Sequence, residues 1–314
     1  MANIAILNYC NLQCPYCFAN KFITEEEKQL ITMEQLENIL NFLSRSKLGR
    51  VALIGGEPTI HPEFSQILER VIKFSQERKI GCTVFSNGIK LGEYARLFLK
   101  SGCLINLNHP EIIGDIKWNE LERSLKKLKA CGSMQNMNFG INLYPDMIDY
   151  DYIFDLAKSY GKDSVRCSYV APTCEYQNVD KKQYYTEAKD LFIPFVLKAK
   201  SLGIRVRLDC NNIPMCYFTP EELAEINDNI EGWKTFCNPV VDISPDMKGT
   251  ACFGAYNLVD LNQFNNLEEA ERYFMLKEMY PRAQNNISGG CAICDKFKNL
   301  SCQGGCLAFS NLIK

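Results

Sequence analysis

The sequence predicts an α/β fold, in which six βα units are followed by a small cysteine-rich domain. Short apolar or β-branched runs alternate with helical periodicity over residues 1–205, which is typical of parallel sheets with helical crossovers. Runs such as 51–54 are continuously apolar, as parallel strands covered on both faces must be. Beyond residue 205, Gly, Asn and Cys largely replace this periodicity. We therefore expect a barrel-like or open parallel sheet over 1–205 and a second domain over 206–314, whose loops need metal or cross-links.

Each expected element follows from a local pattern. Strands are expected at 3–8, 50–54, 80–86, 103–107, 137–143, 164–170 and 204–209. Helices are expected at 32–46, 62–78, 92–101, 118–131, 150–160, 182–202, 220–230 and 266–280. Capping boxes at Thr32–Gln35 and Thr219–Glu222 mark two helix starts, and residues 240–249 predict a strand, a turn and a return strand. Ligands would collect at the carboxyl ends of the parallel strands.

Composition and charge exclude several classes of protein. The 314 residues are 46% hydrophobic and 23% charged, with a net charge of −2, so the chain is not mainly disordered and lacks the basic surface that non-specific nucleic-acid binding needs. No apolar run reaches the ~18 residues of a membrane span, and residues 1–10 do not resemble a secretion signal. We expect a cytoplasmic protein with neither a nucleic-acid nor a membrane partner.

Cysteine is unusually abundant, with 16 residues against only two histidines, His61 and His109. Disulfides are rare in a reducing cytoplasm, so clustered cysteines indicate metal or redox chemistry. Two histidines are too few for a multi-histidine metal centre.

Three cysteines, Cys10, Cys14 and Cys17, follow the first expected strand and so lie in a loop on the ligand-binding side of the sheet. Three thiolates at this spacing can bind three irons of a cubane cluster and leave the fourth iron open to substrate or cofactor. A structural zinc site would need a fourth ligand, and none lies nearby in the sequence. A zinc site completed from elsewhere in the chain stays the alternative.

Three motifs at the ends of successive expected strands resemble the signature of the radical S-adenosylmethionine (radical SAM) superfamily. The first has an aromatic residue before its last cysteine, and the third is similar to the family's T-N-G segment. The motifs are Cys10-x₃-Cys14-x-Tyr16-Cys17, Gly55-Gly56-Glu57-Pro58 and Thr83-Val-Phe-Ser86-Asn87-Gly88. They cover residues 1–90, and the βα units extend the match to residue 205. The resemblance implies a partial (β/α)6 TIM-like barrel.

The resemblance also implies a site and a chemistry. The first three cysteines would hold a [4Fe–4S] cluster whose open iron binds S-adenosylmethionine (SAM). The reduced cluster would cleave SAM to methionine and a 5′-deoxyadenosyl radical that abstracts hydrogen from a substrate. SAM would contact Tyr16, Gly55, Gly56, Glu57, Ser86 and Asn87. Taken without the cysteines, the two glycines, Ser86 and Asn87 are equally ordinary as turn residues, and Tyr16 as a packing residue.

A second group of cysteines lies near the C-terminus, in the order Cys237-x₁₄-Cys252, then Cys291-x₂-Cys294-x₇-Cys302-x₃-Cys306. It resembles the SPASM/twitch extension of radical SAM enzymes, which carries auxiliary iron–sulfur clusters. The Cys294–Cys302 spacing is longer than usual in that extension, and no further cysteine follows Cys306. By the resemblance, Cys237, Cys252 and Cys306 would share one cluster, and Cys291, Cys294 and Cys302 another. One or two auxiliary [4Fe–4S] clusters are expected, with a structural zinc knot as the alternative.

Two further cysteines, Cys210 and Cys216, have two interpretations. Either they supply missing thiolates, since eight cysteines suffice for two closed cubanes, or one of them donates a hydrogen atom to a substrate radical. The remaining cysteines are expected to be small hydrophobic residues, at 82, 103, 131, 167 and 174.

The leading functional hypothesis is an enzyme that modifies a peptide or protein, because SPASM-type enzymes mostly cross-link, epimerise or oxidise peptides. The first motif starts at residue 10, so we expect either a separate leader-peptide-binding protein or a small substrate. A small-molecule dehydrogenase is therefore the alternative, and a non-catalytic iron–sulfur or zinc module is a third interpretation. Ferredoxin or flavodoxin is the expected electron donor.

Overall fold

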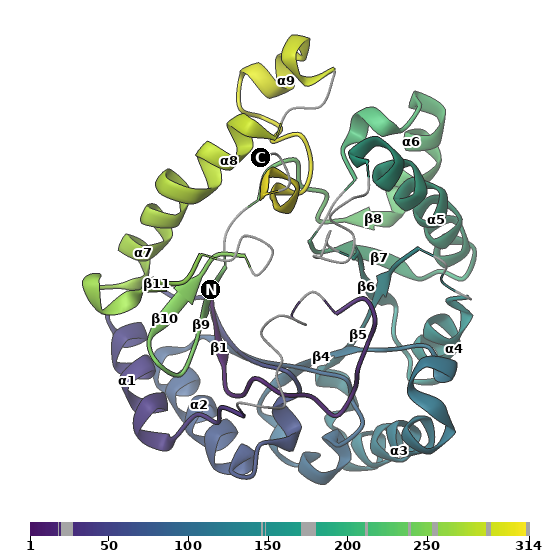
Figure 1. Cartoon of the computed structure of the whole chain (residues 1–314). Helices are drawn as coiled ribbons and strands as arrows, with labels where there is room; N and C mark the ends of the chain where they lie inside the picture. The colour runs from purple at the N-terminus through teal and green to yellow at the C-terminus, as the bar shows by residue number, and fades with distance from the viewer. Residues whose placement is uncertain are drawn as a thin grey trace. The chain divides into compact units, whose positions relative to one another are not determined.

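The computed structural model describes residues 1–17, 19, 28–145, 147, 149–170, 180–210, 213–237, 240–252, 257–286 and 290–311. The chain folds into two compact units, each built from two separate stretches: Met1–Asn138 with Pro239–Phe274, and Phe139–Asn238 with Met275–Lys314. Both units combine parallel strands with helices (Figure 1), which confirms the α/β prediction. The domain division near residue 205 stays a prediction.

The first unit contains a sheet in the order β11-β10-β9-β1-β2-β3-β4. Its strands are β1 Ala2–Ala5, β2 Arg50–Ile54, β3 Gly81–Ser86, β4 Gly102–Asn106, β9 Val241–Ile243, β10 Lys248–Thr250 and β11 Val259–Asp260. The strands from β9 through β4 pair in parallel, while β9, β10 and β11 form an antiparallel meander. The hairpin predicted for residues 240–249 is therefore confirmed, and it joins the sheet beside the N-terminal strand.

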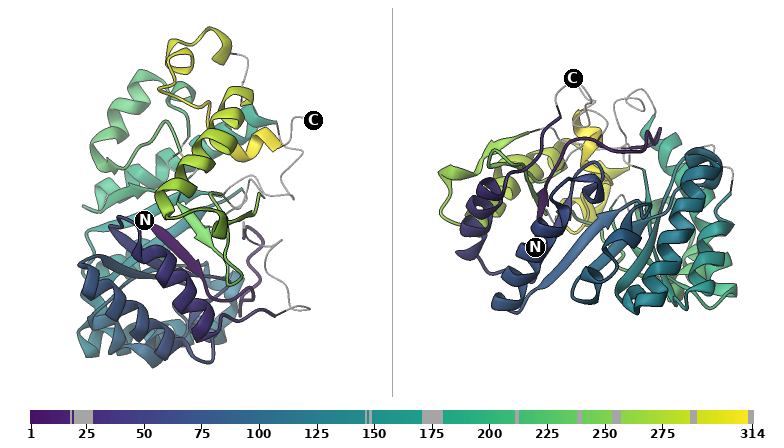
Figure 2. Two further views of the ribbon diagram at one scale, coloured as in Figure 1. Left: turned by 90° about the vertical axis from the view of Figure 1, so that its left-hand side faces the viewer. Right: turned by 90° about the horizontal axis from the view of Figure 1, so that it is seen from below.

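The two faces of this sheet differ in polarity. Ile4 and Leu53 are register partners on β1 and β2, and both are fully buried. On the other face Asn3 is in register with Ala52 and with Asp242, so this face carries small and polar side chains. Helices α1 and α2 lie side by side, and α2 packs on β2 and β3 (Figures 1 and 2). The helices of this unit are α1 Met33–Ser44, α2 Phe64–Arg78, α3 Pro110–Cys131 and α7 Leu267–Phe274.

Helix α1 begins at the predicted capping box. The Thr32 hydroxyl accepts a hydrogen bond from the Gln35 backbone N–H at 3.2 Å, and the Gln35 side-chain oxygen accepts from the Thr32 N–H at 2.9 Å. These bonds satisfy two backbone donors that the first helical turn leaves unpaired. The predicted apolar stripe of Leu36, Ile39, Leu40 and Leu43 is buried.

The second unit contains four parallel strands in the order β5-β6-β7-β8. They are β5 Met137–Leu143, β6 Ser164–Tyr169, β7 Arg205–Leu208 and β8 Ile230–Glu231. Its helices are α4 Asp151–Ser159, α5 Lys181–Ser201, α6 Pro220–Ile226, α8 Tyr280–Asn285 and α9 Asp295–Lys298. Helix α6 begins at the second predicted capping box. None of the helices in the described ranges combines the length and hydropathy of a membrane span.

One predicted helix is wrong. Residues 92–101 form two 3₁₀ turns, Leu91–Tyr94 and Leu97–Leu99, in place of an α-helix. Gly92 is a weak helix former, and its backbone packs so closely that an added Cβ would lie 2.8 Å from the Ser124 Cα atom.

Three other helices differ in their limits. The helix predicted at 220–230 ends at Ile226, and a 3₁₀ turn at Asn227–Asn229 and strand β8 follow it. The helix predicted at 118–131 begins at Pro110 and is kinked at Gly114, whose φ is 78°. The helix predicted at 266–280 is divided: α7 is followed by a π-helical turn, Met275–Met279, and then by α8.

Candidate active site

The first cysteine motif lies in the loop that follows β1, as predicted. Cys10, Cys14 and Cys17 are all partly buried. The Cys17 N–H donates to the Cys14 carbonyl at 3.0 Å, and the Leu12 N–H donates to the Cys10 sulfur at 3.4 Å. The loop therefore folds back on itself and brings its three thiols into one region. We refer to residues 7–17 as the cluster loop.

The three thiols form a donor set that fits an iron–sulfur cluster. Burial raises the pKa of the Cys10 thiol to about 11 and that of Cys14 to about 12, and the neighbouring thiols raise both pKa values further. Burial also raises the pKa of Cys17. Deprotonating three such thiols requires a positive charge among them, which iron would supply if it were bound by Cys10, Cys14 and Cys17. Three protein thiolates leave one position of a cubane open.

The two predicted glycines support the cluster loop by direct backbone contact. The Gly56 N–H donates to the Leu7 carbonyl, and the Glu57 N–H donates to the Tyr9 carbonyl, both at 3.1 Å. A Cβ added at Gly56 would overlap the Tyr9 carbonyl oxygen and lie 2.9 Å from the Cys10 nitrogen. One added at Gly55 would lie 2.6 Å from the Leu7 carbonyl oxygen. The close packing of residues 55 and 56 against the cluster loop is therefore enough to require glycine at both positions.

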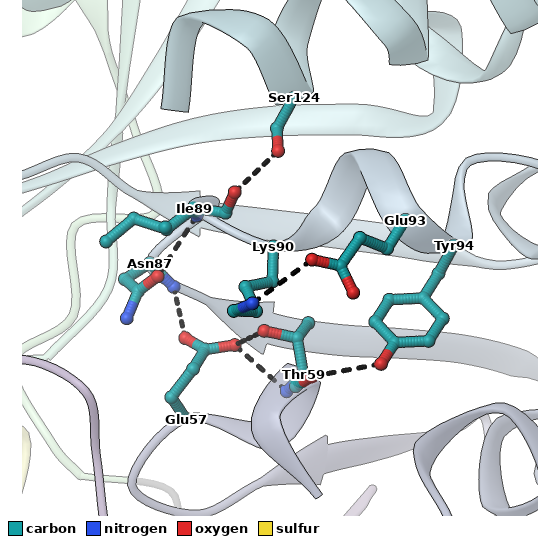
Figure 3. Close-up of polar contacts among 8 residues, drawn as sticks. All are labelled: Glu57, Thr59, Asn87, Ile89, Lys90, Glu93, Tyr94 and Ser124. Carbon is teal, nitrogen blue, oxygen red and sulfur yellow. Dashed lines mark hydrogen bonds and ion pairs between the residues drawn. The ribbon is translucent and has the colours of Figure 1, made fainter. Parts of the chain in front are cut away.

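Glu57 is buried and joins the loops that follow β2 and β3 (Figure 3). Its Oε1 atom accepts hydrogen bonds from the Thr59 N–H at 3.0 Å, the Thr59 hydroxyl at 2.5 Å and the Ser86 hydroxyl at 2.8 Å. Its Oε2 atom accepts from the Asn87 N–H at 2.7 Å. Burial raises the pKa of the Glu57 carboxyl, and these four hydrogen bonds oppose that rise.

Ser86 and Asn87 connect this network to the cluster loop. The Asn87 amide group donates to the Asn11 side-chain oxygen at 2.8 Å, and its own oxygen accepts from the Ile89 N–H at 3.1 Å. The Ser86 hydroxyl oxygen accepts from the Gly88 N–H at 3.0 Å. The structure thus brings together the three predicted motifs, and the roles of Tyr16, Gly55, Gly56, Glu57, Ser86 and Asn87 as SAM contacts stay predictions.

Two asparagines and a lysine of the site were not identified from the sequence. Asn108, just after β4, accepts hydrogen bonds from the Tyr16 hydroxyl and, at 3.3 Å, from the Cys14 thiol. Lys117 on α3 donates to the Asn11 carbonyl at 2.8 Å. The sequence position of Asn108 could have identified it, since a polar residue directly after a parallel strand lies at the ligand-binding edge of the sheet.

Both histidines cap helical turns. His61 Nε2 is 3.2 Å from the Ile31 carbonyl oxygen, and its Nδ1 atom accepts from the Glu63 N–H at 3.1 Å. His109 is the N-cap residue of α3, and its Nδ1 atom accepts from the Glu111 N–H at 3.2 Å.

Most of the C-terminal cysteines lie in the second unit. The Cys237 N–H donates to the Gln303 side-chain oxygen at 2.6 Å, and the Gln303 NH₂ group donates to the Cys237 sulfur at 2.7 Å. The Cys306 N–H donates to the Tyr185 hydroxyl at 2.5 Å. Cys252 belongs to the first unit, so a cluster shared by Cys237, Cys252 and Cys306 stays a prediction.

The other cysteines vary in exposure. Cys210 and Cys216 are exposed, and both of their predicted roles stay open at this point. Cys82, Cys103 and Cys167 are buried and Cys131 is partly buried, whereas residue 174 lies outside the described residues.

Comparison with known proteins gives the same assignment for the N-terminal part. Residues 4–141 match the sequence profile of the Radical SAM superfamily. The GTP 3′,8-cyclase of Psychromonas ingrahamii is 26% identical over 99 residues, which are 32% of this chain and 29% of that protein. Human molybdenum cofactor biosynthesis protein 1 is 29% identical over 100 residues, or 32% of this chain and 15% of that protein. The chain therefore spans less than a third of the length of these two relatives.

Solved structures extend the likeness in fold to nearly the whole chain. Streptococcus suis SuiB bound to S-adenosylmethionine superposes with a TM-score of 0.67 at 18% sequence identity, covering 99% of this chain and 73% of that one. SuiB bound to the precursor peptide SuiA gives a TM-score of 0.65, with coverage of 99% and 72%. The fold is thus similar to that of radical SAM TIM-like barrel enzymes, and the match to the Radical SAM superfamily covers residues 4–141.

Proposed function

We propose that this protein is a radical SAM enzyme that modifies a peptide by hydrogen abstraction. In this proposal Cys10, Cys14 and Cys17 hold a [4Fe–4S] cluster with one open iron, and the C-terminal cysteines hold one or two auxiliary clusters. The observation that carries the proposal is the convergence of three separate loops. The cluster loop rests on the backbone of Gly55 and Gly56, and Glu57 ties it to the loop that carries Asn87.

The residues of the site have distinct tasks in this proposal. When bound, the cluster and SAM supply reductive cleavage of the cofactor and a radical that removes hydrogen from a C–H bond. The chain's own residues position and shield these groups. Tyr16, which is buried, fixes the last turn of the cluster loop through Asn108. Asn87 holds the other side of the loop through Asn11.

A peptide is the proposed substrate because SuiB, whose fold covers 99% of this chain, has a structure with a precursor peptide bound. The expected partners are an electron donor such as ferredoxin or flavodoxin and, for a peptide substrate, a separate leader-binding protein. We place the protein in the cytoplasm.

A nucleotide or another small molecule is the second candidate substrate. The sequence relatives named above include a GTP 3′,8-cyclase that is 26% identical over 99 residues, and this likeness supports a small-molecule cyclase. A small-molecule dehydrogenase, the alternative expected from the sequence, belongs to the same class of candidate. A non-catalytic iron–sulfur or zinc module is the remaining alternative.

The first experiment tests catalysis without any substrate. The anaerobically reconstituted chain is mixed with SAM and dithionite, and 5′-deoxyadenosine is measured by chromatography and mass spectrometry. We expect deoxyadenosine from the parent chain and its loss in Cys14→Ala, while Cys131→Ala, which alters a partly buried cysteine of α3, should match the parent. Retained SAM cleavage in Cys14→Ala would show that the site is wrongly assigned.

A second experiment separates the substrate classes. Precursor peptides and GTP are added in parallel reactions, and each is analysed for a mass change. A peptide that changes mass and suppresses the substrate-free cleavage of SAM supports the proposal. A change in GTP alone would replace it with the second candidate, and an intact open-site cluster without any deoxyadenosine would favour the non-catalytic module.

A further inference from the structure

We propose that Cys216 is the fourth thiolate ligand of a [4Fe–4S] cluster in the second unit, together with Cys291, Cys294 and Cys302. This ligand set deepens the auxiliary cluster of the proposed function and rests on it. It chooses between the two interpretations of Cys216, as a ligand and not as a hydrogen donor.

Three of the four thiols lie on one short segment whose backbone is folded tightly. The Cys294 N–H donates to the Cys291 carbonyl at 3.1 Å across a 3₁₀ turn. Cys294 then caps α9, and its carbonyl accepts from the Lys298 N–H at 3.0 Å. After α9 the chain reverses, and the Cys302 N–H donates to the Lys296 carbonyl at 2.9 Å. Local backbone bonds therefore hold Cys291, Cys294 and Cys302 close together.

Gly304 places two of these sulfur atoms on a common side. The Gly304 N–H donates to the Cys302 sulfur, with 3.4 Å between nitrogen and sulfur. A Cβ added at this glycine would lie 3.5 Å from the Cys291 sulfur. Its φ of 72° is one that glycine adopts readily. Backbone N–H groups that point at cysteine sulfurs are a usual feature around iron–sulfur clusters, because they stabilise the thiolate charge.

Cys216 lies in a different part of the same unit. It lies in the 3₁₀ turn Met215–Tyr217, which packs on α5. The Tyr217 ring lies 5.1 Å from the ring of Tyr185 on that helix, and the Tyr185 hydroxyl accepts from the Cys306 N–H. One buried tyrosine thus anchors both the turn that carries Cys216 and the end of the C-terminal motif.

Cys216 also lies near the three thiols of that segment, within electrostatic range of Cys291, Cys302 and Cys294. Within the described residues no three Cys, His, Asp or Glu side chains converge on one ion. A cubane cluster does not require its ligands to converge on one ion, since each thiolate binds a different iron.

Lys181 lies beside the same group of thiols. Its ammonium group donates to the Asn286 carbonyl and to the Asn286 side-chain oxygen, each at 2.9 Å, and both acceptors are neutral. Asn286 is itself buried and donates to the Gln303 carbonyl, so the lysine is held in a fixed place. The ammonium lies within electrostatic range of Cys291, Cys306, Cys302 and Cys216. A partly buried ammonium is stabilised by nearby negative charge, which ligating thiolates would provide.

The test isolates the second unit's iron by removing the first cluster. The full chain with Cys10, Cys14 and Cys17 all changed to Ala is purified without oxygen, and its iron and sulfide are counted. A single auxiliary cubane should leave ~4 irons per chain. Adding Cys216→Ala should open one position, so that a chelator removes most of this iron and the EPR signal of the reduced cluster is lost or shifted. Cys210→Ala, an exposed cysteine six residues earlier, is the matched control and should retain both.

The outcomes distinguish this ligand set from the proposed function. Retained iron in Cys216→Ser with a shifted EPR spectrum would support a ligand at this position, because serine replaces the sulfur with oxygen. An iron count and EPR spectrum unchanged by Cys216→Ala would overturn the ligand set and favour the hydrogen-donor interpretation. Zinc in place of iron would also overturn it. No iron or sulfide in the background variant would refute the auxiliary cluster itself, whereas deoxyadenosine formation by the parent chain tests the first site separately.

Discussion

The Glu57 carboxylate accepts a hydrogen bond from the Asn87 backbone N–H at 2.7 Å, and so joins the loops that follow β2 and β3. The same carboxylate accepts three hydrogen bonds on its other oxygen. Since the Asn87 side chain bonds Asn11 of the cluster loop, one buried acid helps to position three loops. Its contribution is therefore open to a direct stability measurement.

Glu57→Gln should destabilise the protein. The glutamine oxygen can replace only one carboxylate oxygen, so its NH₂ group would face the Asn87 N–H, donor against donor. A buried donor left without an acceptor costs ~1–3 kcal/mol. We expect a loss of that size in the free energy of unfolding, measured with denaturant. Glu63→Gln is the control, because Glu63 makes no side-chain capping bond to α2; equal effects of the two variants would contradict the role of Glu57.

Gly56→Ala should disturb the cluster loop even when no cofactor is bound. The added Cβ would overlap the Tyr9 carbonyl and crowd the Cys10 nitrogen, so the backbone must shift at a cost of ~1–3 kcal/mol. Unfolding of the apoprotein measures this cost. Gly49→Ala has open space around its Cβ and should be nearly neutral. An apoprotein of Gly56→Ala as stable as the parent would mean that this glycine serves only the cofactor.

Asn108→Ala should loosen the cluster loop. It removes the acceptor of the buried Tyr16 hydroxyl and of the Cys14 thiol, and we expect a loss of ~1–3 kcal/mol in unfolding free energy. In Tyr16→Phe the hydroxyl is absent, so adding Asn108→Ala to that background should cost less than it does in the parent. Strictly additive losses in this double-mutant cycle would show that the two side chains do not depend on each other.

The stability of the protein should fall between about pH 4 and pH 7 because of Asp242. Burial raises the pKa of this carboxyl to about 7 from its usual 3.8, and a hydrogen bond from Asn3 lowers it by less. In that range the folded state binds a proton that the unfolded state has released, so the free energy of unfolding decreases as pH rises. The loss is complete above pH 7, and we expect it to be on the order of 4 kcal/mol.

Asp242→Asn should abolish this pH dependence and be the more stable form at pH 8. An asparagine stays neutral and can donate to the Asn3 side-chain oxygen, which is buried and makes no hydrogen bond among the described residues. Denaturant unfolding at pH 5 and pH 8 measures the effect. In Asp246→Asn, the control, the replaced carboxyl has a lowered pKa beside Lys248, so it should leave the slope between pH 5 and pH 8 intact. A variant at Asp242 with the parent's slope would contradict the raised pKa.

The sequence predicted most of the strand positions because each strand carries its own signal. The continuously apolar run Val51–Ile54 lies in β2 between two parallel neighbours, and Thr32 starts α1 through a bond to Gln35. The helix prediction for residues 92–101 was wrong because contacts with residues distant in the sequence, and not the local sequence pattern, determine the backbone there. Gly92 packs on Ser124, which is distant in sequence, and no local pattern reports such a contact.

The candidate site divides in the same way. The three cysteines, the two glycines and Glu57 were identified because they lie in compact motifs at strand ends. Asn11 and Asn108 were missed because their roles depend on partners from other loops, Asn87 and Tyr16. The sequence did not decide between the two interpretations of Cys216 for the same reason, since only the fold brings its turn against α5.

The pairing of β1 with β9 has a consequence for how the protein is made. Strand β1 leaves the ribosome long before β9, so one of its two neighbours is not synthesised until residues 241–243 have followed. Until then the nascent chain exposes an unpaired strand edge, the kind of surface that promotes association with other chains. A fragment cut at residue 205 would keep that edge permanently, so production of the N-terminal part by itself should give aggregated protein.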